Sequence, residues 1–529
     1  MRSVRRGASS GRQAPVARIG YRAPVYHWRR ARGRPGCDAV GGLAEAGRPE
    51  APFVVARLLE QQDWQAFERR YAATGRAPYL PRQMMGLILY GLMQGVHSLR
   101  ELERLARMDL RCMWVAGGIT PDHANANIGR FIVLHEDALT LEFFEALTRA
   151  ILKASGSSSA RLAGDGTVIE AVCSRYNLLK QEAARDRAQA AEAALEHAPT
   201  DGAAQRAKQR ASQCQEICDA RLGARQDKGK GTESLRINST EPEAMVQRLK
   251  RRQGYGASYK LSVLANGDRI VTAFALDASS ETRVVASMLD QSARVTGAQA
   301  EEVLLDAGYF DDEVIRATLA LGVSLLCPPG QWPSGQMEGG LFHKSAFDYD
   351  ELTDSYRCPA GPTLHLEAKA RRTQNTREHR VYGAYTCGDC HLRENCTKAV
   401  HGWRIKRYPE DEQREALRVV MQHPQARRIF SQRKAIVEPV FSSLRGQQGL
   451  NRFRRHGLAA AKREFALHAM AHNLSRAVAL QTALLAVQWA TLLVLSKFGV
   501  NSTRSTSRRA SALQPHALGL PHDAFCDSL

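Results

Sequence analysis

Residues 259–327 constrain the fold most, because short apolar runs alternate there with helical segments. Residues 259–264 and 269–276 have the composition of two strands, and the Asn266-Gly267 turn between them is a strong hairpin signal. After this hairpin we expect, in order, a helix at 281–293, a strand at 303–305, a helix at 311–321 and a strand at 323–327. This alternation predicts an α/β domain.

Two aspartates lie at informative places in this pattern. Asp165 lies within a β-like segment at residues 161–176, and Asp306 directly follows the strand at 303–305. The carboxyl end of a central strand is where α/β sheets usually place their sites. A single Asp at a strand end is more often a turn or cap residue, so the prediction of a site depends on further acids.

Glu438 is the third acid, and it lies on a predicted helix. A core-facing stripe runs past it, formed by Val437, Val440, Phe441 and Leu444. Lys434 lies four residues before Glu438 and Arg445 seven after, so the two cations share a face with the acid. This arrangement suits a metal ligand beside a phosphate backbone, and intrahelical ion pairing is the simpler alternative. Pro439 predicts that the helix begins or bends at the acid.

Together, Asp165, Asp306 and Glu438 can bind two Mg²⁺ ions, for which Mn²⁺ can substitute. Such ions activate an oxygen nucleophile in phosphodiester chemistry. The net charge of +20 indicates a polyanionic partner, and we expect double-stranded DNA. Arg452, Arg454 and Arg455 form one cluster that could contact phosphates.

Four cysteines form a metal-like pattern: Cys358, Cys387, Cys390 and Cys396. Four thiolates in a reducing compartment suit structural Zn²⁺, and Cys387-x-x-Cys390 is a good chelating turn. Free cysteines, another metal or a redox role are the alternatives left open by the irregular spacing. The odd total of eleven cysteines argues against a disulfide framework and for a cytoplasmic protein, associated with the nucleoid if it binds DNA.

The apolar segment at residues 477–495 is interpreted as a buried C-terminal helix and not as a membrane span, because Gln481 and Gln488 interrupt it. His468 and His472 lie one turn apart ahead of it, and no glutamate at metalloprotease spacing accompanies them. We therefore expect these histidines to be structural. The first residues carry no apolar segment typical of a secretory signal, and no membrane partner is expected.

Two helix starts are predicted in the N-terminal part. Ser98 and Glu101 predict a helix N-cap, and Pro121 predicts the start of another helix.

The composition divides the chain into six parts. We expect a disordered basic arm (1–54), a helical DNA-binding domain (55–155), the first part of the α/β core (160–328) with a helical insertion (177–235), a Cys-rich basic insertion (329–430), a helical completion of the core (431–495) and a disordered tail (496–529).

Over residues 55–480 the chain resembles the DDE transposases of bacterial insertion sequences. The resemblance rests on three sets of motifs: Tyr79-Leu-Pro81-Arg, Gly95-Val-His-Ser98 and Thr120-Pro121-Asp122-His123; Asp165-Gly-Thr, Asp306-Ala-Gly-Tyr-Phe and Glu438-Pro-Val-Phe; and Gly449-Leu-Asn-Arg-Phe with Asn473-Leu-Ser-Arg. It implies a ribonuclease H-like catalytic core. In the family's Tyr-Arg-Glu-Lys signature, Lys434, Glu438 and Arg445 occupy the last three positions, and Ser431 replaces the tyrosine.

The resemblance implies a mechanism in which Asp165, Asp306 and Glu438 bind Mg²⁺ for cleavage at the element's ends. The freed 3′-hydroxyl then attacks target DNA, and a homodimer would join two ends. A lysine at position 434 cannot reproduce a bidentate arginine contact with phosphate. A catalytically inactive DNA-binding remnant and a nuclease of the same fold are the alternatives.

Overall fold

A computed structural model describes residues 50–71, 78–123, 127–139, 141–227, 229–249, 254–330, 341–342, 344–371, 373, 377–384, 387–399 and 402–497. The predicted basic arm lies outside these residues up to residue 49, and helix α3 (Ala51–Glu60) occupies the rest of it. The predicted tail lies outside them from residue 498 onward.

The N-terminal part of the described chain is helical. It comprises α3, α4 (Gln65–Glu68), α5 (Pro81–Met93), α6 (Leu99–Met108), α7 (Leu110–Val115), α8 (Asn127–Leu134) and α9 (Leu141–Ser155). Ser98 caps α6 as predicted, since its hydroxyl accepts the Glu101 N–H at 3.1 Å. The helix start predicted at Pro121 is wrong, because residues 121–123 are not helical. Instead, the His123 N–H donates to Glu103 of α6 at 2.8 Å.

A six-stranded mixed sheet forms the centre of the molecule, and it confirms the predicted α/β class. Its path is β4 (Met245–Arg248), β5 (Tyr255–Asn266), β1 (Arg161–Glu170), β7 (Glu302–Leu304) and β8 (Ser324–Leu326), and β6 (Val271–Asp277) also pairs with β5. β5 is antiparallel to its neighbours, whereas β1, β7 and β8 are parallel. The predicted β5–β6 hairpin is confirmed. The strand predicted at 161–176 ends early, at Glu170.

Helix α17 (Gln432–Ser442) packs on β1 and β5, while α12 (Val285–Thr296) and α13 (Asp312–Ala320) supply the connections between strands. α17 begins six residues before Glu438 and continues through Pro439, so the predicted helix start at the acid is wrong. Pro439 has no N–H for the carbonyl of Ala435. The side chain of Arg269 donates its Nε–H to that carbonyl at 3.2 Å instead. A π-helical turn, Ser443–Gln447, follows.

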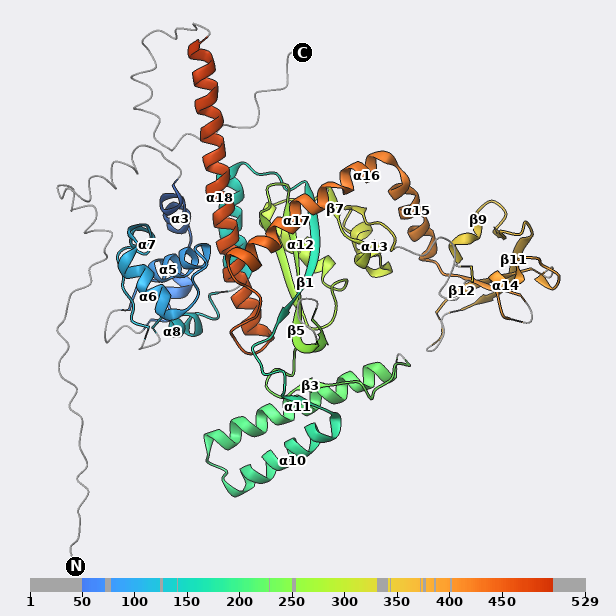
Figure 1. Ribbon diagram of the computed structural model, residues 1–529, viewed down its shortest axis with the longest axis horizontal. Helices are drawn as coiled ribbons and strands as arrows, with labels where there is room; N and C mark the ends of the chain where they lie inside the picture. Colours follow the sequence, from blue (N-terminus) through green and yellow to red (C-terminus); the bar gives the residue numbers. More distant parts are fainter. Residues whose placement is uncertain are drawn as a thin grey trace, which may run out of the picture.

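Helix α18 (Leu458–Lys497) lies between the sheet and the N-terminal helices and contacts β6, α3, α5 and α9 (Figure 1). Its first half is buried, but Leu484 is 50% and Val487 64% exposed. The prediction of a buried helix through residue 495 is therefore wrong for the second half, which extends beyond its neighbours (Figure 1). In the part of the chain that the structure describes, no helix has the length and apolarity needed to cross a bilayer.

Two further modules flank the centre (Figure 1). One is a helical hairpin, α10 (Gln181–His197) and α11 (Gly202–Gln226), joined to short strands β2 (Leu178–Leu179) and β3 (Ile237–Asn238). The other is a five-stranded sheet of β9 (Asp348–Asp350), β10 (Ser355–Arg357), β11 (Thr363–Ala370), β12 (His379–Gly383) and β13 (Ile405–Arg407). Helices α15 (Asp411–Gln422) and α16 (Pro424–Phe430) lead from this sheet back to α17.

Asn473 on α18 is fully buried and joins three elements. Its Oδ1 accepts the Val271 N–H at 2.8 Å, and its Nδ2 donates to the Val271 carbonyl at 2.8 Å and to Thr148 at 3.1 Å. Asn473→Leu leaves buried polar groups unpaired, so we expect the free energy of unfolding to fall by about 2–3 kcal/mol. Urea unfolding measures this loss. Gln488→Leu, at an exposed position of the same helix, is the matched control and should change little. An equal effect of both substitutions would contradict the role of Asn473.

Candidate active site

Asp165 and Asp306 approach each other at the sheet. Asp165 lies within β1, and its carboxylate accepts the Gly166 N–H at 2.8 Å. Asp306 follows β7 and caps the short 3₁₀ helix η1 (Ala307–Tyr309), since its Oδ1 accepts the Gly308 N–H at 2.9 Å. Each of these contacts fixes one carboxylate oxygen and leaves the other oxygen available. β1 and β7 are adjacent and parallel, which is why residues 141 positions apart in the chain meet.

Arg433 joins the two acids. Its Nη1 lies 3.6 Å from Asp165 Oδ2, and its Nη2 lies 3.8 Å from Asp306 Oδ2. The guanidinium is buried and also donates to the Gly164 carbonyl at 2.9 Å. Sequence reasoning missed this residue, although a signal was present. Arg433 falls on the same stripe as Val437 and Leu444, and a cation at a core-facing position needs a buried partner.

The electrostatics of the pair are set by burial and by neighbouring acids. Burial raises the pKa of Asp165, and the negative charges of Asp306 and Glu281 add to this, while Arg433 and the Gly166 N–H lower it. Glu281 lies against the backbone of Gly166, where a Cβ would come within 2.8 Å of the Glu281 carboxyl carbon. Lys260 lies 3.6 Å from Glu281. Three carboxylates therefore gather around two cations, which favours the binding of a further cation.

Glu438 lies on α17, five residues after Arg433, with an exposed side chain. Among the described residues, Asp165, Asp306 and Glu438 do not form a set whose ligand atoms all lie within 4.8 Å of one another. Two ions about 3.5–4 Å apart do not require so tight a set. The structure thus brings Asp165 and Asp306 to one guanidinium and places Glu438 on the helix that carries this guanidinium.

The cations predicted around Glu438 have different environments. Lys434 is exposed. Arg445 reaches β1, where its Nη2 donates to the Val168 carbonyl at 2.9 Å and to the Thr167 hydroxyl. Arg445 therefore ties the π-helical turn after α17 to the strand that carries Asp165.

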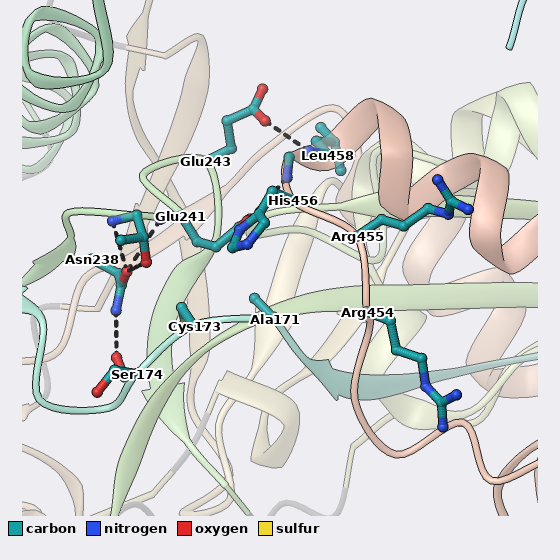
Figure 2. Close-up of polar contacts among 12 residues, drawn as sticks. Ala171, Cys173, Ser174, Asn238, Glu241, Glu243, Arg454, Arg455, His456 and Leu458 are labelled. Carbon is teal, nitrogen blue, oxygen red and sulfur yellow. Dashed lines mark hydrogen bonds and ion pairs between the residues drawn. The ribbon is translucent and has the colours of Figure 1, made fainter. Parts of the chain in front are cut away.

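The segment before α18 carries the other predicted basic residues. Arg452 donates to the backbone carbonyls of Ala171 (3.0 Å) and Cys173, so its guanidinium binds the chain after β1. The N–H groups of Arg454 and Arg455 donate to the buried carboxylate of Glu464. This contact holds the backbone of the segment, and the two side chains extend away from it (Figure 2).

Two more acids, Glu241 and Glu243, also fix this segment (Figure 2). Glu241 is 1% exposed and accepts hydrogen bonds from Tyr259 at 2.9 Å, from His456 at 2.6 Å and from the Gly457 N–H at 3.1 Å. Glu243 accepts the Leu458 N–H at 2.7 Å, at the first residue of α18, where a negative charge also complements the helix dipole. The segment bearing Arg454 and Arg455 is thus held at its backbone.

The four predicted cysteine ligands gather at one end of the five-stranded sheet. Cys358 follows β10, Cys387 and Cys390 lie in a turn, and Cys396 ends α14 (Arg393–Cys396). All four are free thiols.

Glu103, Asp122 and His123 form the one described group of three potential metal ligands within 4.8 Å. Glu103 already accepts the N–H of His123 and pairs with Arg107, so these contacts account for the cluster as a link between α6 and the following segment.

His468 and His472 are buried, in agreement with the structural role predicted for them. His472 Nε2 donates to the Arg269 carbonyl at 2.8 Å, and its Nδ1 accepts from Ser443 at 3.2 Å, which fixes a neutral ring. Burial lowers the pKa of His468 to about 3 and that of His472 to about 4.

These depressed pKa values predict a pH-dependent stability. In the unfolded chain these histidines have a pKa of 6.5 and take up protons below this pH. In the folded chain they stay neutral until the pH approaches their lowered pKa values. Their contribution is therefore present above pH 6.5 and is lost as the pH falls toward 4, by up to about 1.4 kcal/mol per pH unit for each histidine. Unfolding curves of His472→Gln should show a weaker pH dependence in this window. The exposed His197→Gln is the control, and an unchanged slope in both variants would contradict the prediction.

Comparison with known families identifies two domains in the chain. A model described as "Transposase DDE domain" matches residues 357–478, a span that contains Glu438, Arg433 and the four cysteines. A model described as "Transposase domain (DUF772)" matches residues 47–131, which include α3 to α7. No curated protein and no solved structure matches the chain. With a transposase domain at the N-terminal helices and a transposase DDE domain around Glu438, the two matches support a DDE-type transposase of an insertion sequence.

Proposed function

We propose that this transposase cuts DNA at the ends of its element and joins the freed 3′-ends to target DNA, with Asp165, Asp306 and Glu438 as the metal-binding acids. The observation that carries the proposal is the approach of Asp165 and Asp306 to a single buried guanidinium at the edge between β1 and β7. The strand order β6-β5-β1-β7-β8, with β5 antiparallel and β7 and β8 parallel to β1, supports a ribonuclease H-like core.

The residues present fit a divalent cation. Asp165 and Asp306 each have one oxygen bound to a backbone N–H and a second oxygen facing Arg433. Carboxylate oxygens are the ligands that Mg²⁺ and Mn²⁺ prefer. A bound ion would activate a water or a sugar hydroxyl and stabilise the leaving oxygen of the phosphodiester.

The chain's own residues supply position and charge. Arg433 holds the two aspartates at a fixed separation and limits their mutual repulsion, which pre-organises the site. Arg445 fixes the turn that follows α17 against β1, and Glu438 is thereby held on a helix anchored at both ends. The excess of carboxylates keeps the site selective for cations.

DNA contacts are proposed for Lys434, Arg445, Arg452, Arg454 and Arg455, together with the helical N-terminal part. Arg454 is the best supported of these, since its backbone is fixed by Glu464 and its side chain is exposed, whereas Arg455 is half-buried. Arg445 and Arg452 already bind backbone carbonyls, so they would act mainly by shaping the surface. We propose a homodimer on DNA, because two element ends must be joined.

The test is a cleavage and strand-transfer assay with Mg²⁺, labelled DNA that carries the element's ends and an unlabelled target duplex. Metal-dependent cleavage followed by joining to the target supports the proposal. Cleavage of the intact ends would instead indicate a nuclease if pre-cut 3′-ends, supplied in a separate reaction, are not joined to the target. DNA binding with neither reaction would indicate an inactive remnant. Parallel reactions with EDTA establish whether the reaction depends on a metal.

A further inference from the structure

We propose that Cys358, Cys387, Cys390 and Cys396 bind one Zn²⁺ that stabilises the five-stranded sheet β9–β13 and holds it against the catalytic core. This site is separate from the one proposed at Asp165, Asp306 and Glu438. Zinc binding can therefore be tested without an assay of transposition. Four thiolates are the ligand set of a closed structural zinc site.

The module has a small apolar core. Five side chains make up its fully buried part: Phe347, Tyr356, Leu364, Tyr382 and Ile405. Cys358 and Cys396 pack against the same cluster, so the cysteine end of the sheet continues this core. Modules with so little apolar burial usually need a disulfide or a metal ion for stability, and the described cysteines form no disulfide.

The first of the two turns that carry the cysteines contains Cys358. Cys358 begins a turn in which the Gly361 N–H donates to the Cys358 carbonyl at 2.8 Å, and Gly361 has a φ of +106° that favours glycine. Burial raises the pKa of the Cys358 thiol, and a backbone hydrogen bond from Ala360 acts in the opposite direction. A backbone N–H directed at sulfur stabilises a thiolate and orients it for a metal.

The second turn carries Cys387 and Cys390, and α14 follows it. Arg393 closes the turn, because its N–H donates to the Cys390 carbonyl at 3.0 Å and its side chain to the Cys387 carbonyl at 2.6 Å. Gly402, at φ +80°, passes so close that a Cβ there would lie 2.7 Å from the Cys387 sulfur. The turn is thus held from two sides, by Arg393 and by Gly402.

The four thiols lie within electrostatic range of one another. Burial raises the pKa of Cys396 to about 11, and the charges of Cys358, Cys387 and Cys390 add to this rise. The sulfurs are nevertheless spaced more widely than a coordinated set, since no three of them lie within 4.8 Å of one another in the described structure. A zinc ion would therefore draw the two turns together and displace the thiol protons.

The stabilised sheet would in turn fix a contact with the catalytic core. Arg377, between β11 and β12, lies 3.6 Å from Asp312 and 3.1 Å from Glu410. Asp312 is the first residue of α13 and also pairs with Arg414 of α15. Asp312 lies six residues after Asp306, so these ion pairs link the sheet to the segment that follows a proposed active-site acid.

The experiment is to measure zinc in the purified full-length chain by mass spectrometry, for wild type and for Cys358→Ser, Cys387→Ser, Cys390→Ser and Cys396→Ser. We expect about one zinc per chain in wild type and a loss of most of it in each variant. Cys173→Ser changes a cysteine outside the module and is the matched control, which should keep the metal. Zinc in wild type at the same level as in the four variants would overturn the proposal, and so would iron in its place.

A second measurement does not depend on whether the variants fold. Wild type is stripped of metal and loaded with Co²⁺, whose visible absorption distinguishes a tetrahedral thiolate site from oxygen or nitrogen ligation. The thiolate spectrum, together with slower tryptic cleavage within residues 341–407 when metal is present, supports the proposal. No thiolate spectrum, with all four thiols reacting freely with a thiol reagent, would overturn it.

Discussion

Asp306→Asn is expected to lower the rate of DNA cleavage by about 10³-fold, because the substitution removes a charge of the proposed metal site, worth several kcal/mol of transition-state stabilisation. The amide keeps the shape of the side chain and can still accept the Gly308 N–H that caps η1, so the fold should be retained. DNA binding by the variant should stay within about twofold of wild type, since the proposed phosphate contacts come from other residues. Cleavage of labelled element ends with Mg²⁺ measures the first effect, and gel retardation measures the second.

Glu313→Gln is the matched control for this substitution. Glu313 is exposed in the first turn of α13, seven residues after Asp306, and its change removes the same charge near the site without altering a proposed ligand. Activity should survive in the control. Equal cleavage by Asp306→Asn and wild type would remove Asp306 from the site and with it the proposed metal-binding triad.

Arg433→Met is expected to lower the free energy of unfolding by about 3 kcal/mol in the absence of divalent metal, near the lower end for a broken buried ion pair. The lower end applies because Asp306 keeps 38% of its side chain exposed. The substitution leaves the Gly164 carbonyl without its donor and leaves Asp165 facing Asp306 without a cation. The pKa of Asp165, already raised by burial, should rise further.

Lys434→Met gives the control, because it removes a neighbouring cation at an exposed position of the same helix. Urea unfolding with and without Mg²⁺ compares the two variants. Added Mg²⁺ should recover part of the loss in Arg433→Met, since it supplies positive charge between the acids, and it should do little in Lys434→Met. Equal losses in both variants would show that Arg433 does not hold the acids together.

Local features were predicted well from the sequence. The Asn266-Gly267 hairpin forms because the turn residues themselves favour it, and Ser98 caps α6 because its partner lies three residues away. Pro121 failed as a helix start, since Glu103 binds the following backbone from a distant helix. A single local signal could not anticipate that contact.

The site was predicted only in part, for a physical reason. Patterns in the sequence identified Asp165 and Asp306, but their approach depends on the parallel pairing of β1 with β7, a long-range choice. Arg433 was missed, because its partners Asp165 and Asp306 lie more than 100 positions away in the chain and meet it only in the folded protein. The catalytic roles of Asp165, Asp306 and Glu438 stay predictions, as do the DNA contacts and the domain boundaries. Pro439 within α17 is tolerated through Arg269, which lies 170 positions away in the chain.

The position of α18 has a consequence for how the molecule is made. This helix contacts α3, α5 and α9, yet about 300 residues or more separate it from them in the chain. During synthesis the N-terminal helices emerge long before the surface that covers them, and closing so large a loop slows folding. A nascent chain that stops before residue 458 would expose the apolar faces of these helices and should be a substrate for chaperones and proteases. Complete translation thereby becomes a condition for a stable protein.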